Sequence, residues 1–490
     1  MHVHAQNPNI KRTWHWRFGT YAGLDFNTGH PVAVTTGKTA TELGTASISD
    51  TAGNLLFYTD EEFVWNKNNT WMPNGTGLCP DGPGGNDGVL ALPKPDSSNI
   101  FYVFSMDNKV DTTSIKELWV YSVIDMTKDG GLGDVVSKGN YLMPGNLFPP
   151  NGGFTVKITA VPVANERAYW IITMRFDSDT FYVYKFNDSG ISPNPVINSV
   201  GKFDSIGTDN LTAYSDGKKL VAAFSAGNYL GGIEFLDFND STGAISNPFF
   251  SPNGLTDNQI SVTPDDKFLY NEVRYFGSNG GINGNALYQY NLKAGSPSSI
   301  IASRIRIDSI WKIDTVDGIP LKGLHLGLQY APDGKIYTTR AWDSSLGVIN
   351  HPDSLGTACN NVDSAINLLS GWAVLDLPYY PNFYFADSSL LFSVPAVQHY
   401  SAKDSAILYP NPSHGVFTVA IKNYDPIVIG LKITNYIEIF NMLGQKVASL
   451  PFKGGNKIQV NLSNTPAGVY LYRIITESGK QITSGKFIIL

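Results

Sequence analysis

Cysteine is scarce in this chain, which has two cysteines, Cys79 and Cys359, among its 490 residues. Two cysteines cannot build a disulfide framework, so a hydrophobic core has to hold the fold together. Their separation in the sequence says nothing about their distance in space. We expect two isolated, buried thiols, with a single disulfide bond between them as the alternative.

Long apolar runs and basic clusters are lacking as well. No stretch of about eighteen apolar residues occurs, so no segment is expected to span a membrane. The formal net charge is −7, and charged residues make up only 16% of the chain. An acidic chain without a Lys/Arg run favours neither nucleic acid nor an anionic membrane surface as a partner.

Catalytic signatures are also missing. None of the eight histidines belongs to an HExxH motif, and no EF-hand loop, GxSxG elbow, P-loop or dinucleotide fingerprint occurs. We therefore expect no metal and no cofactor, and we assign no catalytic residue. An enzymatic activity is the less favoured hypothesis.

Glycine, proline and aromatic residues, in contrast, are plentiful, with 48 Gly, 28 Pro and 12% aromatics. This composition is typical of many short strands joined by tight turns. A turn rich in Asp, Asn, Gly or Lys is repeatedly followed by an apolar, aromatic strand. Examples are DTAGNLLFYTD (50–60), PDDKFLYNEVRYF (264–276) and PDGKIYTTRAW (332–342).

These units recur every 45 to 70 residues or so, with about four strands in each, which is typical of the blades of a β-propeller. Six units fall within residues 40–360. A seventh would form if strands in 14–26 paired with a strand in 379–389, leaving no exposed edge at the seam. Seven blades are favoured, with six or eight as alternatives.

The predicted fold class is all-β, in two domains. A β-propeller spans residues 14–394, a linker follows at 395–405, and residues 406–490 contain about seven short strands, as in a small immunoglobulin-like β-sandwich. Residues 1–13 form an N-terminal arm. There, Val3-His4-Ala5 before Gln6 has the small-residue pattern of a signal peptidase site, which indicates a truncated signal peptide.

The last 85 residues or so contain four pieces in this order: YPNP, IEIFNMLGQKV, NLSNTPAGVYLYRI and the terminal GKFIIL. In content and order they resemble the type A C-terminal sorting domain of the type IX secretion system of Bacteroidota. The sorting-motif residues within them are Tyr409, Pro410, Asn411, Pro412, Gly444, Gly468 and Lys486. The resemblance implies that the secretion machinery is a partner and that the protein is secreted or lies on the cell surface. A generic immunoglobulin-like adhesion domain is the alternative.

The N-terminal portion contains, among other pieces, FGTYAGLDFNTGHPVAV (18–34), SVIDMTKDGGLGDV (122–135) and LGVINHPDSLGTACNNV (346–362). Through these pieces it is similar to a family of propeller-like domains from surface proteins of the same bacteria. The resemblance implies the architecture and the location. It supplies no activity.

Candidate ligand-binding residues come in two kinds. Asp60, Glu61 and Glu62 follow a strand at a loop, and Asp25, Asp177 and Asp179 are further carboxylates; a pair of such carboxyls could cleave a glycosidic bond, although acidic loop residues more often form turns. The tryptophans Trp65, Trp71 and Trp342, together with Trp311, lie near Asn and Asp residues, as in carbohydrate-binding surfaces. Packing between blades is the more ordinary role for them.

Three functional hypotheses follow. The first is a non-catalytic adhesion module that binds an extracellular glycan or protein. The second is a secreted polysaccharide hydrolase or lyase that uses loop carboxylates. The third is a structural component of the cell surface or of the gliding apparatus.

Overall fold

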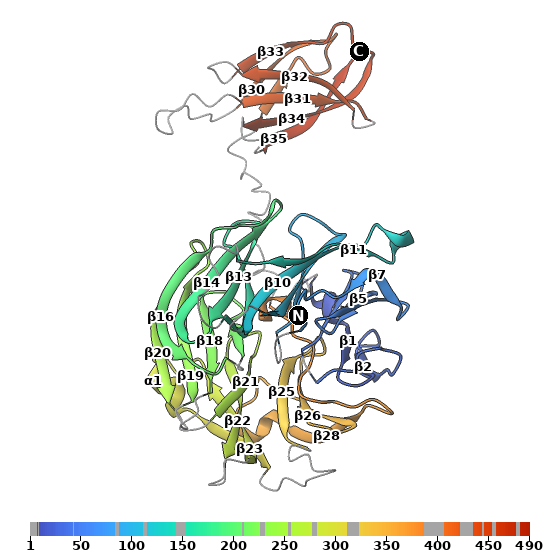
Figure 1. Ribbon diagram of the computed structural model, residues 1–490. Helices are drawn as coiled ribbons and strands as arrows, with labels where there is room; N and C mark the ends of the chain where they lie inside the picture. Colours follow the sequence, from blue (N-terminus) through green and yellow to red (C-terminus); the bar gives the residue numbers. More distant parts are fainter. Residues whose placement is uncertain are drawn as a thin grey trace. The chain divides into compact units, whose positions relative to one another are not determined.

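The computed structural model describes sixteen stretches of the chain. They are residues 7, 9–42, 44–83, 88–110, 115–143, 153–207, 210–225, 231–252, 256–276, 282–310, 323–386, 406–421, 435–442, 445–452, 457–476 and 481–490. The chain divides into two compact units, Met1–Ser393 and Val394–Leu490 (Figure 1). The expected signal remnant (1–5) and linker (395–405) lie outside the described residues.

Unit 1 is a succession of antiparallel sheets, each built from strands consecutive in the chain. The sheets, in chain order, are β1 (His15–Phe18), β2 (Ala22–Asp25), β3 (Val32–Ala33); β4 (Ala46–Ser49), β5 (Leu55–Thr59), β6 (Phe63–Asn66), β7 (Trp71–Thr76); β8 (Leu90–Pro93), β9 (Ile100–Val110), β10 (Ile115–Asp125), β11 (Asp134–Tyr141); β12 (Phe154–Pro162), β13 (Tyr169–Arg175), β14 (Ser178–Asn187), β15 (Gly190–Ile191), β16 (Val196–Asp204); β17 (Leu211–Ala213), β18 (Lys219–Phe224), β19 (Gly232–Asn239), β20 (Ala244–Pro252); β21 (Thr256–Val262), β22 (Phe268–Phe276), β23 (Ile282–Asn291), β24 (Ile305–Ile310); and β25 (His325–Tyr330), β26 (Ile336–Arg340), β27 (Ser345–Ile349), β28 (Asn361–Asn367).

Helices in the described part of unit 1 are short. They are η1 (Ile10–Thr13), η2 (Asp129–Gly131), α1 (Pro297–Ala302), η4 (Gly356–Cys359) and η5 (Asn382–Tyr384). No helix among the described residues is long and apolar enough to cross a membrane. The meandering sheets succeed one another around the unit (Figure 1), which is the architecture of a β-propeller.

Turns form where the sequence predicts them, because Asp and Asn side chains accept hydrogen bonds from their own turn. Between β4 and β5, Asp50 Oδ1 accepts from the backbone N–H groups of Ala52 (2.8 Å) and Asn54 (2.9 Å). Within a sheet, burial falls from the first strand to the last. Eight of the nine residues of β12 are buried, whereas β16 of the same sheet alternates between half-buried and exposed residues up to its last residue, the buried Asp204. The first strands therefore form the centre of the unit.

Antiparallel pairing gives the sheets two distinct ends. In the four-stranded sheets, the turn between the second and third strands, as at β5–β6 and β26–β27, lies at one end, which we call the connection end. The turn between the first and second strands, as at β4–β5, lies at the other end, which we call the hairpin end. Successive sheets are joined at the connection end, because the fourth strand finishes there.

The first and last parts of unit 1 meet, but not by the strand pairing that the sequence predicts. Residues 379–386 form no strand, and residues 387–389 lie outside the described residues. The physical reason is that Pro378 and Pro381 lack the N–H groups that a ladder needs. Instead, Thr20 exchanges two backbone hydrogen bonds with Trp372, both 3.0 Å long. We call this junction the seam.

Residues 376–386, the inner segment, run along the first strands of several sheets. The Tyr379 hydroxyl lies 2.7 Å from Thr159 Oγ1 of β12, and the Tyr380 hydroxyl donates to the His15 carbonyl of β1 at 3.2 Å. Asn382 Nδ2 donates to the Ala213 carbonyl of β17 at 3.3 Å. At the hairpin end, the Asn7 amide reaches the carbonyl groups of Phe383 (2.9 Å) and Tyr384 (2.8 Å). The centre of the unit is thus filled by its own chain.

A small cavity remains beside the inner segment, lined by β12, β17, β21 and β25 and by Asp376, Leu377 and Tyr379. Its volume of about 20 Å³ leaves room for roughly one water molecule.

Cys79 and Cys359 are both buried and both free, so the expectation of isolated thiols is confirmed.

Unit 2 is a two-sheet β-sandwich with seven strands among its described residues. One sheet contains β29 (Ala406–Tyr409), β30 (Val416–Ile421) and β33 (Lys457–Asn461); the other contains β32 (Lys446–Phe452), β31 (Asn435–Phe440), β34 (Gly468–Thr476) and β35 (Gln481–Ile489). Its core includes Phe417, Ile437, Val460, Tyr472 and Phe487. These alternate with outward-facing residues, as the binary pattern of the sequence predicts.

Candidate functional site

The predicted acidic triplet forms the turn between β5 and β6, at the connection end. Burial raises the pKa of Asp60 to about 6, although its Oδ1 accepts a hydrogen bond from the backbone N–H of Phe63 at 3.0 Å. Glu61 is fully buried and has a positive φ of 79°. A buried Glu61 carboxylate cannot touch a polysaccharide in this conformation. Glu62 is half-buried in the same turn.

A further buried carboxylate lies close to this turn. Asp107, in β9, accepts hydrogen bonds from the Tyr141 hydroxyl (2.9 Å) and from the backbone N–H of Asp81 (2.8 Å), and burial raises its pKa. The Cys79 thiol donates to the carbonyl groups of Glu61 (3.6 Å) and of Met106 (3.2 Å), the residue before Asp107, and burial raises the pKa of this thiol. Sequence reasoning missed Asp107; the signal was one acidic residue at a buried strand position after IFYVFSM.

The other predicted carboxylates lie apart from this group. Asp25 pairs with His15, whose Nδ1 lies 3.0 Å from Oγ of Ser49 at the β4–β5 turn, so it lies at the hairpin end of the neighbouring sheet. Its Oδ1 accepts from the backbone N–H of Asn27 at 2.8 Å, and its Oδ2 lies 3.6 Å from Nε2 of His15. Asp177 is exposed in the turn between β13 and β14, and Asp179 is half-buried at the start of β14. Asp25 is thus separated from Asp60 by the length of a sheet.

The predicted tryptophans differ in exposure. Trp65 is buried and stacks on Tyr58, with ring centroids 5.3 Å apart. Trp71 is 63% exposed on the outermost strand of its sheet and stacks on Phe63, with centroids 5.8 Å apart. Trp342 is half-buried in the β26–β27 turn with φ 56°. Trp311 lies outside the part of the chain that the structure describes.

Strained hydrophobic residues gather at the seam. The non-glycine residues described with positive φ are mostly Asn and Asp, and the bulky hydrophobic ones are Tyr21 (54°), Trp342 (56°) and Leu369 (61°). A positive φ is unfavourable for large side chains and costs about 1–3 kcal/mol each. All three lie beside the seam at the connection end, next to Trp372.

Backbone hydrogen bonds hold these four residues in one network. Tyr21 follows Thr20, which pairs with Trp372. Trp342 precedes Asp343, whose carbonyl accepts from the N–H of Ala373 at 2.8 Å. Leu369 follows Leu368, whose N–H donates to the carbonyl of Ser344 at 2.7 Å.

We call Tyr21, Trp342, Leu369 and Trp372 the seam surface. Tyr21 and Trp372 are 47% and 46% exposed, and Leu369 is more exposed still. Sequence reasoning found only Trp342, because the others become neighbours only when the two ends of unit 1 meet.

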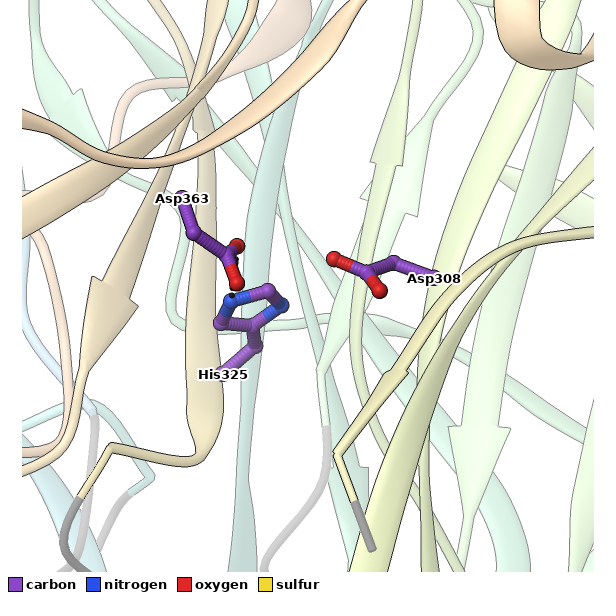
Figure 2. Close-up of side chains that lie close together, drawn as sticks. All are labelled: Asp308, His325 and Asp363. Carbon is purple, nitrogen blue, oxygen red and sulfur yellow. Dashed lines mark ion pairs between the residues drawn. The ribbon is translucent and has the colours of Figure 1, made fainter.

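A second cluster, formed by Asp308, His325 and Asp363, lies between the sheets β21–β24 and β25–β28. One ligand-type atom from each residue lies within 4.8 Å of the other two. Figure 2 shows the imidazole ring between the two carboxylates, which come from β24 and β28. Nε2 of His325 lies 2.9 Å from Oδ1 of Asp363. The contact with His325, ahead of the charge of Arg340, holds the pKa of Asp363 below its ordinary value.

Hydrogen-bond donors orient the oxygens of both carboxylates in this cluster. Nη1 of Arg340 lies 3.3 Å from Oδ2 of Asp363. Asn361 Nδ2 donates to Oδ2 of Asp308 at 2.9 Å, and the N–H of Ser309 donates to its Oδ1 at 2.7 Å. No ligand-spacing motif in the sequence reveals these three residues, because each comes from a different strand.

The predicted sorting-motif residues lie on unit 2. Tyr409 ends β29, and Pro410, Asn411 and Pro412 follow it; all four are exposed. Gly468 begins β34, and Lys486 is exposed in β35. Gly444 lies outside the described residues. Asn411 Oδ1 accepts from the N–H of Ile488 at 2.9 Å, and the N–H of Leu490 donates to the Ser413 carbonyl at 2.8 Å. The YPNP piece is therefore hydrogen-bonded to the terminal strand.

Comparison with known proteins places the second unit in a family. Residues 407–490 match the secretion system C-terminal sorting domain. This domain marks proteins that the type IX secretion system exports, so the protein is located at the cell surface or in the extracellular space. Among curated proteins, none matches the chain.

Several solved structures are similar to this chain. A putative 6-phosphogluconolactonase from Bacteroides fragilis is 11% identical, with 75% of this chain and 98% of that chain covered and a TM-score of 0.44. The periplasmic gluconolactonase of Pseudomonas aeruginosa is 11% identical, covering 75% and 99%, with a TM-score of 0.40. PorZ, a surface component of the type IX secretion system of Porphyromonas gingivalis, is 12% identical, covering 98% and 69%, with a TM-score of 0.31.

Proposed function

We propose that this exported protein is a surface-binding module whose propeller holds an extracellular glycan on the seam surface. The observation that carries the proposal is the concentration of strained, partly exposed hydrophobic residues there: Tyr21, Trp342 and Leu369 have positive φ angles. Backbone strain that the surrounding structure maintains is found mainly at functional sites.

The chemistry of the seam surface suits a sugar. Aromatic rings present a flat apolar face on which a pyranose ring can stack, while nearby polar groups accept and donate hydrogen bonds. Exposed Tyr21 and Trp372 supply the rings, and Asp343, Ser344 and Asn367 belong to the same turns. The filled centre of the propeller favours a ligand on the loop surface rather than along the axis.

Binding of the full-length chain to an array of immobilised glycans tests the proposal. Trp372→Ala should weaken binding about 5- to 150-fold, because stacking on one aromatic ring contributes roughly 1–3 kcal/mol. Phe203→Ala is the matched control, since Phe203 is an exposed aromatic residue in β16, away from the seam. Trp71→Ala tests whether the glycan binds instead at the exposed Trp71 of β7, the other tryptophan site that the sequence predicts.

Each result points in one direction. Loss of binding in Trp372→Ala with unchanged binding in Phe203→Ala supports a glycan site at the seam. Binding that depends on Trp71 alone, or binding to an immobilised surface protein and to no glycan, would overturn it.

A secreted polysaccharide hydrolase is the second candidate, and one observation favours it. Burial raises the pKa of Asp60 to about 6, the range of a general acid that is protonated near neutral pH. Wild-type protein should then release reducing sugars from a polysaccharide, and Asp60→Asn should abolish the release. Equal activity of the two proteins, or none in either, would eliminate this candidate. If the protein neither binds a glycan nor cleaves a polysaccharide, a structural role at the cell surface is the remaining hypothesis.

We also propose that the seven sheets described in unit 1 close into a seven-bladed ring, with β1–β3 as the seventh blade. The Trp16 ring of β1 packs against Tyr337 of β26, with centroids 5.5 Å apart, which supports this closure. The further proposals are that residues 406–490 are a type A sorting domain and that unit 1 belongs to the propeller-like family of surface proteins. An experimental structure of the full chain tests the blade count.

A further inference from the structure

We propose that Asp308, His325 and Asp363 form a binding site for a divalent transition-metal ion, of the Zn²⁺ or Mn²⁺ class, that joins two neighbouring sheets of the propeller. The three residues come from β24, β25 and β28, so an ion held by all three would link sheet β21–β24 to sheet β25–β28 (Figure 2). The inference is independent of the glycan proposal, because none of these residues belongs to the seam surface.

The donor set fits such an ion. One imidazole nitrogen and two carboxylate oxygens are ligands that Zn²⁺ and Mn²⁺ accept in proteins. Ligand atoms about 2.1 Å from a tetrahedral ion lie roughly 3.4 Å from one another. The three ligand atoms here lie within 4.8 Å of one another, and His325 Nε2 and Asp363 Oδ1 lie 2.9 Å apart. Small side-chain movements therefore suffice to bring all three onto one ion.

The buried histidine gives a second, independent indication. His325 is only 2% exposed, and its Nε2 lies 2.9 Å from the carboxylate oxygen of Asp363, in ion-pair range. This contact does not have the geometry of a well-formed hydrogen bond. A polar atom that is buried without a hydrogen bond is unfavourable, and coordination to a metal would satisfy it.

Neighbouring charges are consistent with a divalent ion. Arg340 contacts Asp363 at 3.3 Å and Asp343 at 3.4 Å. With His325 neutral, as a ligand has to be, the carboxylates of Asp308, Asp343 and Asp363 and the guanidinium of Arg340 leave a local charge of −2. A divalent ion neutralises this charge.

Groups around the ligands hold them in place, as metal sites require. Arg340 contacts Oδ2 of Asp363 and leaves Oδ1 facing His325, while Asn361 fixes the carboxylate of Asp308. Such outer contacts orient the ligands and raise the affinity for the metal. The side chain of Asp363 is 42% exposed, which leaves the cluster accessible to ions from solvent.

The test is metal content and thermal stability of the full-length, tag-free chain. The protein is stripped with EDTA, dialysed against a small excess of Zn²⁺ or Mn²⁺, freed of unbound ion and analysed by mass spectrometry for metal. Wild type should retain about one ion per chain and unfold at a higher temperature when loaded. Asp308→Asn and Asp363→Asn should each weaken binding at least about tenfold.

Asp237→Asn is the matched control. Asp237 pairs with Lys219 and its side chain is 42% exposed, as is that of Asp363, but it lies far along the chain in β19. It should leave metal content unchanged. Two outcomes would overturn the proposal. One is a wild-type chain that retains neither ion. The other is equal retention by wild type and Asp363→Asn, which would mean that the ion binds elsewhere, for example at the N-terminal histidines His2 and His4.

Discussion

At the scale of the residue, the buried charges of unit 1 are of two kinds. Lys157 and Asp204 form a fully buried ion pair 2.6 Å long, and Asp204 Oδ1 also accepts from the N–H groups of Ile206 and Gly207. Its charge is therefore compensated. Glu234 differs, because its only described hydrogen-bond donor is the backbone N–H of Lys202, at 2.9 and 3.1 Å from its two oxygens.

Glu234 should make the stability of the protein depend on pH. Burial, assisted by the charge of Asp179, raises its pKa from 4.5 to about 7. Because the folded-state pKa is above the unfolded one, its favourable contribution is complete below pH 4.5 and is lost as pH rises through 7. Glu234→Gln should remove this loss, making the variant more stable than wild type at pH 8 by an amount on the order of 3 kcal/mol. Urea denaturation at pH 5 and pH 8 measures it.

Asp237→Asn should show the opposite sign. Hydrogen bonds from Lys219 and Asn247 lower the pKa of Asp237, so its contribution is present above its unfolded pKa and is lost as pH falls. The variant should therefore be slightly less stable than wild type at neutral pH and equal to it in acid.

The Glu234 prediction has its own contradicting outcome. If the stability of Glu234→Gln depends on pH in the same way as that of wild type, the ionisation of Glu234 is not the cause of the pH dependence.

Single residues were only partly predictable. Asp60, Glu61 and Glu62 could be placed in a turn because they follow an aromatic strand, and the structure puts them there. Asp308, His325 and Asp363 could not be grouped from the sequence. Asp363 lies at an irregularity in the β27–β28 pairing, and such register shifts depend on packing rather than on local pattern.

At the scale of the element, the strands and their turns could be predicted well, because Asp, Asn and Gly occur at regular intervals in the turns between strands. The inner segment could not. Its aromatic residues suggest a strand, but Pro378 and Pro381 interrupt the ladder, and its hydrogen bonds go to four different sheets. An element whose partners are this far apart in the chain has no local signature.

The seam should be sensitive to a single methyl group. Gly19 has a φ of 50°, and a Cβ atom added there would overlap the carbonyl oxygen of Trp372. Gly19→Ala should lower the free energy of unfolding on the order of 3 kcal/mol or more, because it separates Thr20 from Trp372. Gly29→Ala is the matched control: its φ is also positive, at 81°, but an added Cβ would meet nothing within 4 Å.

The control separates the clash with the Trp372 carbonyl group from the cost of placing alanine at a positive φ. Gly29→Ala should cost only about 1 kcal/mol, the usual cost of alanine at a positive φ. Chemical denaturation of both variants measures the difference. Equal destabilisation would mean that the close approach at the seam contributes nothing.

At the scale of the whole molecule, the two compact units could be predicted from the change in strand spacing and from the YPNP motif near residue 409. The way in which the ends of unit 1 meet could not, because it depends on contacts such as that between Asn7 and Phe383, 376 positions apart. Long-range closure of this kind is a property of the assembled sheets.

Truncation should expose this dependence. A chain ending at Ser370 lacks Trp372 and the whole inner segment, and it should fail to unfold cooperatively and be digested rapidly by protease. A chain ending at Ser393 keeps both and should show a cooperative transition by circular dichroism. If the shorter chain is as protease-resistant as the longer one, the inner segment is dispensable.

The position of the inner segment also sets the order of events during synthesis. Residues 376–386 are synthesised after all seven sheets described in unit 1, so the propeller cannot finish folding until they have been made. Loop closure over such a distance is slow, which keeps the polypeptide incompletely folded for longer. The sorting domain, residues 407–490, is made later still. Synthesis that stops before residue 376 therefore gives a chain with neither a complete propeller nor a sorting domain.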